Sequence, residues 1–181
     1  MSKELIKRSK FLSLVLRHEP EKIGIVLDEN GWVEVDVLLT ALTAYGRGME
    51  RASLERVVVE NDKKRFAFSE DGQRIRANQG HSVEVDLALV PQAPPEKLFH
   101  GTVDKFLAAI FTQGLVKGER HHVHLSPDLE TATKVGLRRG NPVILEIDAA
   151  EMHRGGHKFF LSANGVWLTD TVPPQFLQRL P

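Results

Sequence analysis

The feature that most constrains the fold is a change of character near the middle of the chain. Residues 1–81 read as helices followed by a hairpin, whereas short apolar runs typical of strands dominate residues 97–181. Three prolines lie close together in the intervening residues 82–96, and such spacing favours a stiff, extended connection. The sequence therefore predicts two structural parts joined by a linker.

Composition narrows the class of protein. The 181 residues carry 24 Lys and Arg against 24 Asp and Glu, and they include no cysteine. Disulfides and thiolate metal sites are therefore excluded. A net charge of zero argues against salt-driven binding along a nucleic acid, although a few arginines can still hold one phosphate. No apolar run is long enough to cross a bilayer, and the charged N-terminus lacks the apolar stretch of a signal peptide. We therefore expect a cytoplasmic protein that does not associate with a membrane.

In the first part, hydrophobic spacing and caps predict helices, and an alternating pattern predicts a hairpin. The expected helices cover residues 2–18, 34–44 and 53–61, with Ser2 and Ser53 as N-caps. The first would end before Pro20, with Arg17 and His18 in its last turn. The hairpin would pair residues 65–68 with residues 74–76 through Asp71 and Gly72. Helices followed by a two-stranded wing predict a winged-helix lobe.

In the second part, apolar runs at residues 143–147, 159–161 and 166–168 predict strands. Only residues 103–113 and 129–136 have a helical pattern. The predicted fold class is therefore α+β.

Basic and polar residues of the first part could form a phosphate site. Arg17 and His18 stand side by side at a helix end, and Arg65 and Arg76 flank the hairpin, where they could face one cavity. Guanidinium groups match phosphate oxygens in a bidentate manner, although solvated surface charge explains these residues equally simply. The stretch from Asn78 to Ser82, which contains His81, is either a loop of donors or a polar turn.

The second part contains two further candidates. A predicted strand ends in His100, Gly101 and Thr102, where the bare glycine would let a flat ligand approach. Three histidines in four positions, including His122 and His124, admit a metal site, a polar strand or a ribose contact. No companion ligand lies at an evident spacing, so no metal is predicted. Residues 138 and 139, both arginine, follow a predicted helix, where the helix dipole favours positive charge.

The order of these motifs resembles the RNA 2'-phosphotransferase family, known from the last step of tRNA splicing. The similarity covers nearly the whole chain. It rests on residues 14–18, 64–66, 75–82, 98–102, 122–126, 138–140 and 163–168. The resemblance implies a winged-helix lobe followed by an ADP-ribosyltransferase-like lobe that binds NAD. The substrate would be RNA with a 2'-phosphate, and neither a metal nor an obligatory protein partner is implied.

The resemblance also assigns roles to individual residues. The family's catalytic set falls on Arg17, His18, Arg65 and Arg138. Arg138 is preferred to Arg139 because the family's arginine precedes a position that varies between arginine and histidine. The NAD contacts would come from His100, Gly101, Thr102, His124, Leu125, Ser126 and Val166. Arg76 and His81 would contact RNA phosphate.

The implied reaction has two steps. A 2'-phosphate oxygen of the RNA attacks the nicotinamide ribose at C1'' and nicotinamide leaves, which gives RNA with ADP-ribose on its 2'-phosphate. The ribose 2''-hydroxyl then attacks phosphorus, which releases the RNA 2'-oxygen and ADP-ribose 1'',2''-cyclic phosphate. Arginines suit the negative charge that develops in this second step.

Two alternatives share parts of the pattern. A winged-helix nucleic-acid-binding regulator would explain the first part but would leave His100, His124 and Arg138 without a role. An ADP-ribosyltransferase that caps terminal phosphates of nucleic acid, or modifies protein, would perform the first step alone. The residue that aligns with the glutamate of protein-modifying relatives is Val166, which disfavours transfer to protein side chains.

Overall fold

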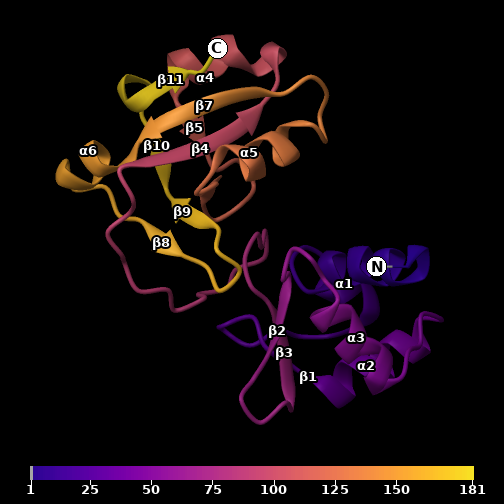
Figure 1. Cartoon of the computed structure of the whole chain (residues 1–181). Coiled ribbons are helices and arrows are strands. Elements are labelled where there is room, and N and C mark those ends of the chain that lie inside the picture. The colour runs from indigo at the N-terminus through magenta and orange to yellow at the C-terminus, as the bar shows by residue number, and fades with distance from the viewer. Residues whose placement is uncertain (1) are drawn as a thin grey trace. The chain divides into compact units, whose positions relative to one another are not determined.

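The structure is a computed structural model that describes residues 2–181. The chain forms two compact units, of which the first ends at Ala88 and the second begins at Leu89. This boundary lies inside the proline-containing segment 82–96. Both units combine helices with antiparallel sheet, so the predicted α+β class is confirmed. Figure 1 labels the elements along the chain.

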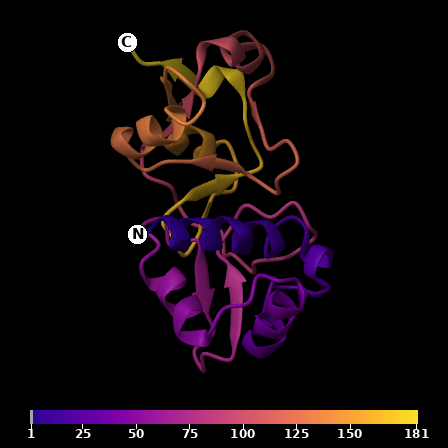
Figure 2. The same cartoon turned by 90° about the vertical axis from the view of Figure 1, so that its right-hand side faces the viewer.

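The first unit places three helices against a small sheet. Its elements are α1 (Lys3–Val15), η1 (Pro20–Ile23), β1 (Val33–Glu34), α2 (Val35–Ala44), α3 (Arg51–Val59), β2 (Phe66–Phe68) and β3 (Arg74–Ala77). The strands lie in the order β1-β3-β2, and all neighbours are antiparallel. Figure 2 shows α1 running across the top of this unit, above the strands. The predicted helix 34–44 and the predicted hairpin are thereby confirmed.

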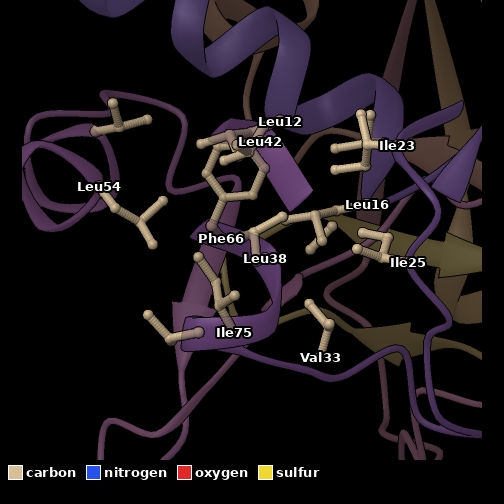
Figure 3. Packing of buried hydrophobic residues seen from close by; sticks show 14 of the residues in the cluster. Leu12, Leu16, Ile23, Ile25, Val33, Leu38, Leu42, Leu54, Phe66 and Ile75 are labelled. Atoms are coloured by element: carbon tan, nitrogen blue, oxygen red, sulfur yellow. The ribbon is translucent and has the colours of Figure 1, made fainter. Parts of the chain in front are cut away.

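The core of the first unit is built from one apolar side of each element. Leu12 of α1, Leu38 of α2 and Leu54 of α3 are fully buried, and Ile75 of β3 joins them. Figure 3 shows these side chains converging with Phe66. Burial of a Leu, Ile or Phe side chain contributes about 1.5–3 kcal/mol. In a chain without cysteine, such contacts hold the unit together.

Three details of the first unit differ from the sequence expectation. The first helix ends at Val15 rather than at residue 18. The third helix begins at Arg51 with Glu50 as its N-cap, so Ser53 lies inside the first turn. Strand β1 was not predicted, because two residues are too few for an alternating pattern. Ser2 does cap α1 as predicted, since its hydroxyl accepts a hydrogen bond from the Leu5 amide at 3.2 Å.

The second unit is richer in strands. Its strands are β4 (Lys97–Thr102), β5 (Leu115–Val116), β6 (Val123–Leu125), β7 (Val143–Asp148), β8 (Phe160–Leu161), β9 (Trp167–Thr169), β10 (Thr171–Val172) and β11 (Leu177–Arg179). They pair as β11-β7-β4, β6-β9-β8 and β10-β5, always antiparallel. An isolated bridge between Phe99 and Ser126 links β4 to the end of β6. The predicted strands correspond to β7, β8 and β9.

The helical segments of the second unit are short. They are η2 (Asp104–Phe106), α4 (Leu107–Gln113), α5 (Leu129–Gly136), α6 (Ala149–Arg154) and η3 (Pro174–Phe176). The predicted helices 103–113 and 129–136 are confirmed as η2 with α4 and as α5. The expectation that only these segments are helical is wrong, because α6 follows β7 directly. With six residues, α6 is too short to show a helical period.

Candidate functional site

The first unit brings together three candidate residues that lie far apart in the sequence. Arg17 and His18 follow the C-cap residue of α1, and Arg65 directly precedes β2. One terminal nitrogen of Arg17, Nη2, donates a hydrogen bond to the Arg65 carbonyl at 3.4 Å. The Arg17 carbonyl in turn accepts from the Ser82 amide at 2.9 Å, and His18 Nδ1 lies 2.8 Å from Ser82 Oγ. The Arg17 guanidinium therefore lies beside the backbone of Arg65, and the His18 ring lies beside Ser82.

The end of α1 explains how Arg17 and His18 are presented. The amides of Leu16 and His18 still bond four residues back, to the carbonyls of Leu12 and Leu14, whereas the Glu19 amide bonds five residues back, also to the Leu14 carbonyl. The chain then leaves the helix because Pro20 disfavours a helical residue before it. Arg17 and His18 consequently lie in the turn after α1, where Arg17 is half-buried and His18 is exposed. The predicted helix end was therefore three residues too late.

Arg76 and Arg65 have different neighbours. The Arg76 guanidinium lies over the Trp32 ring, 4.5 Å from Cζ to the ring centroid, and Nη1 donates to the Asn30 carbonyl at 3.4 Å. Burial lowers the pKa of Arg76, although Asp28 opposes this effect. These contacts tie Arg76 to the loop before β1. A shared cavity for the two residues stays a prediction.

The segment that follows Arg76 carries buried polar atoms that suit a polar ligand or water. Among the described residues, Nε of Arg76, Oδ1 of Asn78 and Oε1 of Gln79 are buried without a hydrogen-bond partner. A buried polar atom without a partner costs about 1–3 kcal/mol, so each such atom calls for an explanation. His81 is also buried, with 2% of its surface exposed, and its ring packs near Gly31.

In the second unit, the backbone determines the protonation of His100. Nδ1 of His100 lies 3.1 Å from the His124 carbonyl oxygen. A carbonyl oxygen only accepts hydrogen bonds, so Nδ1 carries the proton and Nε2 of the neutral ring is an acceptor. Burial lowers the pKa of His100 below its ordinary value, and the positive charges of Arg139 and Arg120 lower it further. The hydrogen bond to the His124 carbonyl acts in the opposite direction and raises the pKa, but it does not outweigh burial. The neutral form is therefore favoured.

His124 has the opposite tautomer. Arg120 Nη1 lies 3.3 Å from His124 Nδ1, and a guanidinium can only donate, so Nδ1 accepts and Nε2 of the neutral ring carries the proton. Burial lowers the pKa of Arg120, and the charge of Arg139 lowers it further. The two histidines thus present one ring acceptor and one ring donor beside two guanidinium charges. Such a set suits ribose hydroxyls together with an anionic group.

Arg120 was missed in the sequence, where it stands outside every motif. Its only signal is its place four residues before His124, in a stretch rich in histidine. The predicted residue, Arg138, is exposed, and within residues 2–181 its side chain makes no hydrogen bond, ion pair or ring contact. Its neighbour Arg139 lies over Phe106, with Cζ 5.9 Å from the ring centroid, and it acts on His100 and Arg120 through its charge. The structure therefore adds Arg120 and Arg139 to the candidates.

Gly101 has a packing role that the sequence did not reveal. A Cβ atom at this position would lie 1.9 Å from the Ala132 carbonyl oxygen and 2.8 Å from the Gly136 amide. Helix α5 therefore crosses β4 at van der Waals distance from the bare glycine. The space that we expected a flat ligand to use on this side is filled by the backbone of α5. Gly101 consequently fixes α5, whose end carries Arg138 and Arg139.

The remaining predicted NAD contacts differ in accessibility. Thr102 and Ser126 are buried polar residues at 3% and 9% exposure, and the Ser126 amide and carbonyl both pair with Phe99. Leu125 is buried in the core, opposite Trp167. Val166 is half-buried and follows a turn in which the Ser162 hydroxyl accepts from its amide at 3.1 Å. This turn positions the start of β9, next to β6.

Two further properties bear on the function. Among residues 2–181, no three His, Asp or Glu side chains are placed to hold a metal ion together. His122 instead lies against Phe160, with the ring centroids 5.4 Å apart. A helix with the length and apolarity to cross a membrane is likewise absent from the described residues.

Comparison with known proteins identifies relatives along the whole chain. Residues 3–171 match the profile of the family described as RNA 2'-phosphotransferase, Tpt1 / KptA family. A protein of Streptomyces griseus is 57% identical over 179 residues, which cover 95% of each chain. Proteins of Hahella chejuensis and Pseudomonas aeruginosa are 54% and 55% identical, over 99% and 98% of this chain and 97% and 98% of their own. All three are named probable RNA 2'-phosphotransferases. The chain therefore belongs to the RNA 2'-phosphotransferase family.

Proposed function

We propose that this protein is an NAD-dependent RNA 2'-phosphotransferase, which removes an internal 2'-phosphate from RNA by transferring it to the ADP-ribose of NAD. The observation that carries the proposal is the convergence of Arg17, His18 and Arg65 in the first unit. In this proposal the first unit, with three helices and a three-stranded sheet, is a winged-helix lobe that binds RNA. The second unit is an ADP-ribosyltransferase-like lobe that binds NAD.

The residues of the second unit fit NAD. His100 offers an acceptor at Nε2 and His124 offers a donor at Nε2, so the pair can bind ribose hydroxyls. The charges of Arg120 and Arg139 suit the pyrophosphate or the incoming phosphate. NAD supplies a ribose carbon from which nicotinamide leaves as a neutral group. In the first step, the task of the protein is to position this carbon and a phosphate oxygen, because the phosphate is already anionic.

The second step depends more strongly on the first unit. Negative charge gathers on the non-bridging oxygens when the 2''-hydroxyl attacks phosphorus, and Arg17 and Arg65 can stabilise it. The attacking hydroxyl loses a proton and the departing RNA 2'-oxygen gains one. His18 is suited to one of these transfers because an imidazole nitrogen can accept or donate a proton. The products are RNA with a 2'-hydroxyl and ADP-ribose 1'',2''-cyclic phosphate.

The fourth arginine of the catalytic set is a choice between Arg120 and Arg138. The resemblance points to Arg138, whereas the hydrogen bond to His124 and the electrostatic effect on His100 favour Arg120. We propose that Arg120 has this role. Arg120→Ala should then slow turnover by about 10²–10³, the typical effect of losing one transition-state donor, whereas Arg138→Ala should stay close to wild type. The reverse result would return the role to Arg138.

The decisive assay is an incubation of an RNA that carries one internal 2'-phosphate with NAD, followed by separation of all products. We expect dephosphorylated RNA, nicotinamide and the cyclic phosphate in equal amounts. Excess EDTA should leave the rate unchanged, because guanidinium groups occupy the role that metal ions have in nucleases. A stable ADP-ribosyl adduct as the end product, on this RNA or on one with a terminal phosphate, would indicate a capping ADP-ribosyltransferase. Binding of duplex DNA without NAD consumption would indicate a regulator.

A further inference from the structure

A buried polar pair lies under α1 in the first unit. Ser9 of α1 and Asn61, which follows α3, are only 1% and 2% exposed. Asn61 Nδ2 donates to Ser9 Oγ at 2.8 Å. Helices α1 and α3 contribute apolar residues such as Leu12 and Leu54 to the core of this unit. Because replacing such a pair by apolar side chains of similar volume is often neutral or stabilising, stability alone does not explain it.

The pair reaches the guanidinium of Arg65. Arg65 Nη1 donates to Ser9 Oγ at 3.4 Å and to Asn61 Oδ1 at 3.5 Å. Each contact is long, but two acceptors on one nitrogen restrict the direction of the planar group. Both acceptors are neutral oxygens, unlike the carboxylates that hold Arg51 and Arg56 on α3. A neutral acceptor orients a guanidinium without cancelling the charge that a phosphate requires.

Asn61 also shapes the backbone that leads into Arg65. Its side-chain oxygen accepts from the Lys63 amide at 3.1 Å, and its carbonyl accepts from the Lys64 amide at 2.8 Å. Lys64 has a φ of +40°, which is unfavourable for a residue with a side chain. Asn78 binds the carbonyl groups of the same segment: its Nδ2 donates to the Lys64 carbonyl at 2.6 Å and its amide donates to the Arg65 carbonyl at 2.9 Å. Such strain persists only where the surroundings over-determine it, and it concentrates at functional sites.

We propose that Ser9 and Asn61 are positioning residues that aim the Arg65 guanidinium at the 2'-phosphate of the RNA. The inference rests on the proposed function, in which Arg65 binds that phosphate. The pair fixes one terminal nitrogen of Arg65, while a guanidinium has five N–H donors in all. Ser9 lies on α1 and Asn61 lies between α3 and β2, and both are buried, so the packed core as well as the local loop sets the direction of Arg65.

The test compares Ser9→Ala with Ser13→Ala. Ser13 lies one turn further along α1, and its hydroxyl donates only to the Ser9 carbonyl, at 2.8 Å. Ser9→Ala should weaken the affinity for adenosine 2'-phosphate, measured by calorimetry, by about 5–10-fold, which is the size of effect expected from the loss of one ordinary hydrogen bond. Its melting temperature should fall further than that of Ser13→Ala, because Asn61 Nδ2 then loses its buried acceptor, so affinities are compared well below both melting temperatures. The affinity of Ser13→Ala should equal that of wild type. Equal affinities in both variants would overturn the proposal.

Two further variants separate positioning from folding. In Arg65→Ala, adding Ser9→Ala should cause no further loss of affinity, because residues that act through one another are not additive. An independent, additive loss would contradict the proposal. Asn61→Asp keeps the acceptor for the Lys63 amide but introduces a carboxylate beside Arg65. It should retain or raise the melting temperature while it lowers affinity and turnover by tenfold or more. Unchanged affinity and turnover would also contradict the proposal.

The proposed function can fail separately from the positioning role. If wild type binds adenosine 2'-phosphate and responds to Ser9→Ala but consumes no NAD, the proposed function is wrong and the positioning role stands. If wild type performs the whole reaction but Ser9→Ala binds and turns over like Ser13→Ala, only the positioning role is wrong. If wild type binds no 2'-phosphate, both are wrong, because Arg65 then has no phosphate to meet.

Discussion

The two units present their candidate groups by different physical means. In the first unit, Arg17 and Arg65 stand at the ends of elements, and neutral oxygens orient them. In the second unit, His100 and His124 stand on strands, and a carbonyl and a guanidinium determine which ring nitrogen carries the proton. The first unit therefore offers positive charge, and the second offers a defined set of donors and acceptors. Positively charged guanidinium groups suit the binding of a phosphate. Ring nitrogens with fixed donor and acceptor roles suit the binding of sugar hydroxyls.

The largest expected effect concerns the charge of the first unit. Arg65→Ala should slow the second chemical step more than the first, by about 10²–10³, because only the second gathers negative charge on phosphorus. RNA that carries ADP-ribose on its 2'-phosphate should then accumulate in single-turnover reactions on denaturing gels. Arg138→Ala should act in the same way if the resemblance, rather than the contacts of Arg120, identifies the fourth arginine.

The conservative variant sharpens this expectation. Arg65→Lys should recover little of the activity, because an ammonium keeps the charge but loses the planar fork. Slow loss of substrate with no adduct at any time would assign Arg65 to binding or to the first step. The contrast between guanidinium charge in the first unit and histidine donors and acceptors in the second would then need revision.

The second prediction concerns the scaffold of the second unit. Gly101→Ala places a methyl group 1.9 Å from the Ala132 carbonyl oxygen, so α5 must move away from β4. Overpacking of this kind typically costs about 1–3 kcal/mol, and a clash with backbone belongs at the upper end. Chemical unfolding should show the loss, together with weaker NAD binding. Gly155→Ala is the control, since its nearest atom would lie at 3.3 Å and its φ is not positive.

Some of these residues and elements could be predicted from the sequence, and others could not. Arg17, His18, His100 and His124 could be named as candidates because they stand in motifs whose order resembles a known family. Helix α5 and the β2–β3 hairpin were predictable because their patterns are regular over several residues. Ser9 and Asn61 were not, because a polar residue on a helix reads as surface until the tertiary structure buries it. Arg120 and the role of Gly101 depend on contacts between segments that no local pattern records.

The third prediction separates the duties of the two units. His100→Ala should weaken NAD binding by roughly tenfold, the equivalent of about 1.4 kcal/mol, because it removes one ring acceptor and leaves the His124 carbonyl without its donor. Arg17→Ala should leave the affinity for NAD nearly unchanged, since the Arg17 guanidinium donates to the Arg65 carbonyl, within the first unit. Calorimetry with NAD alone measures both. Loss of NAD binding in Arg17→Ala would show that the duties are not divided in this way.

The smallest expected effect is a pH dependence that belongs to His100. Its pKa in the folded protein is lowered from the ordinary value of 6.5, chiefly by burial, so the unfolded chain binds more protons as the pH falls through this value. Stability should therefore decrease from about pH 6.5 downward and level off below the folded pKa.

His100→Asn removes the titrating group and retains a donor near the position of Nδ1. Its melting temperature should fall less than that of wild type between pH 8 and pH 5.5, by at most about 6 °C, since one pH unit below 6.5 is worth at most about 1.4 kcal/mol and 1 kcal/mol corresponds to about 2–4 °C in a chain of this size. His122, whose pKa is also lowered chiefly by burial, contributes in the same direction to both proteins and so cancels in the comparison. If the two proteins lost stability equally on acidification, the proton on His100 would not be controlled by its surroundings, and the second unit would bind NAD by shape rather than by a chosen tautomer.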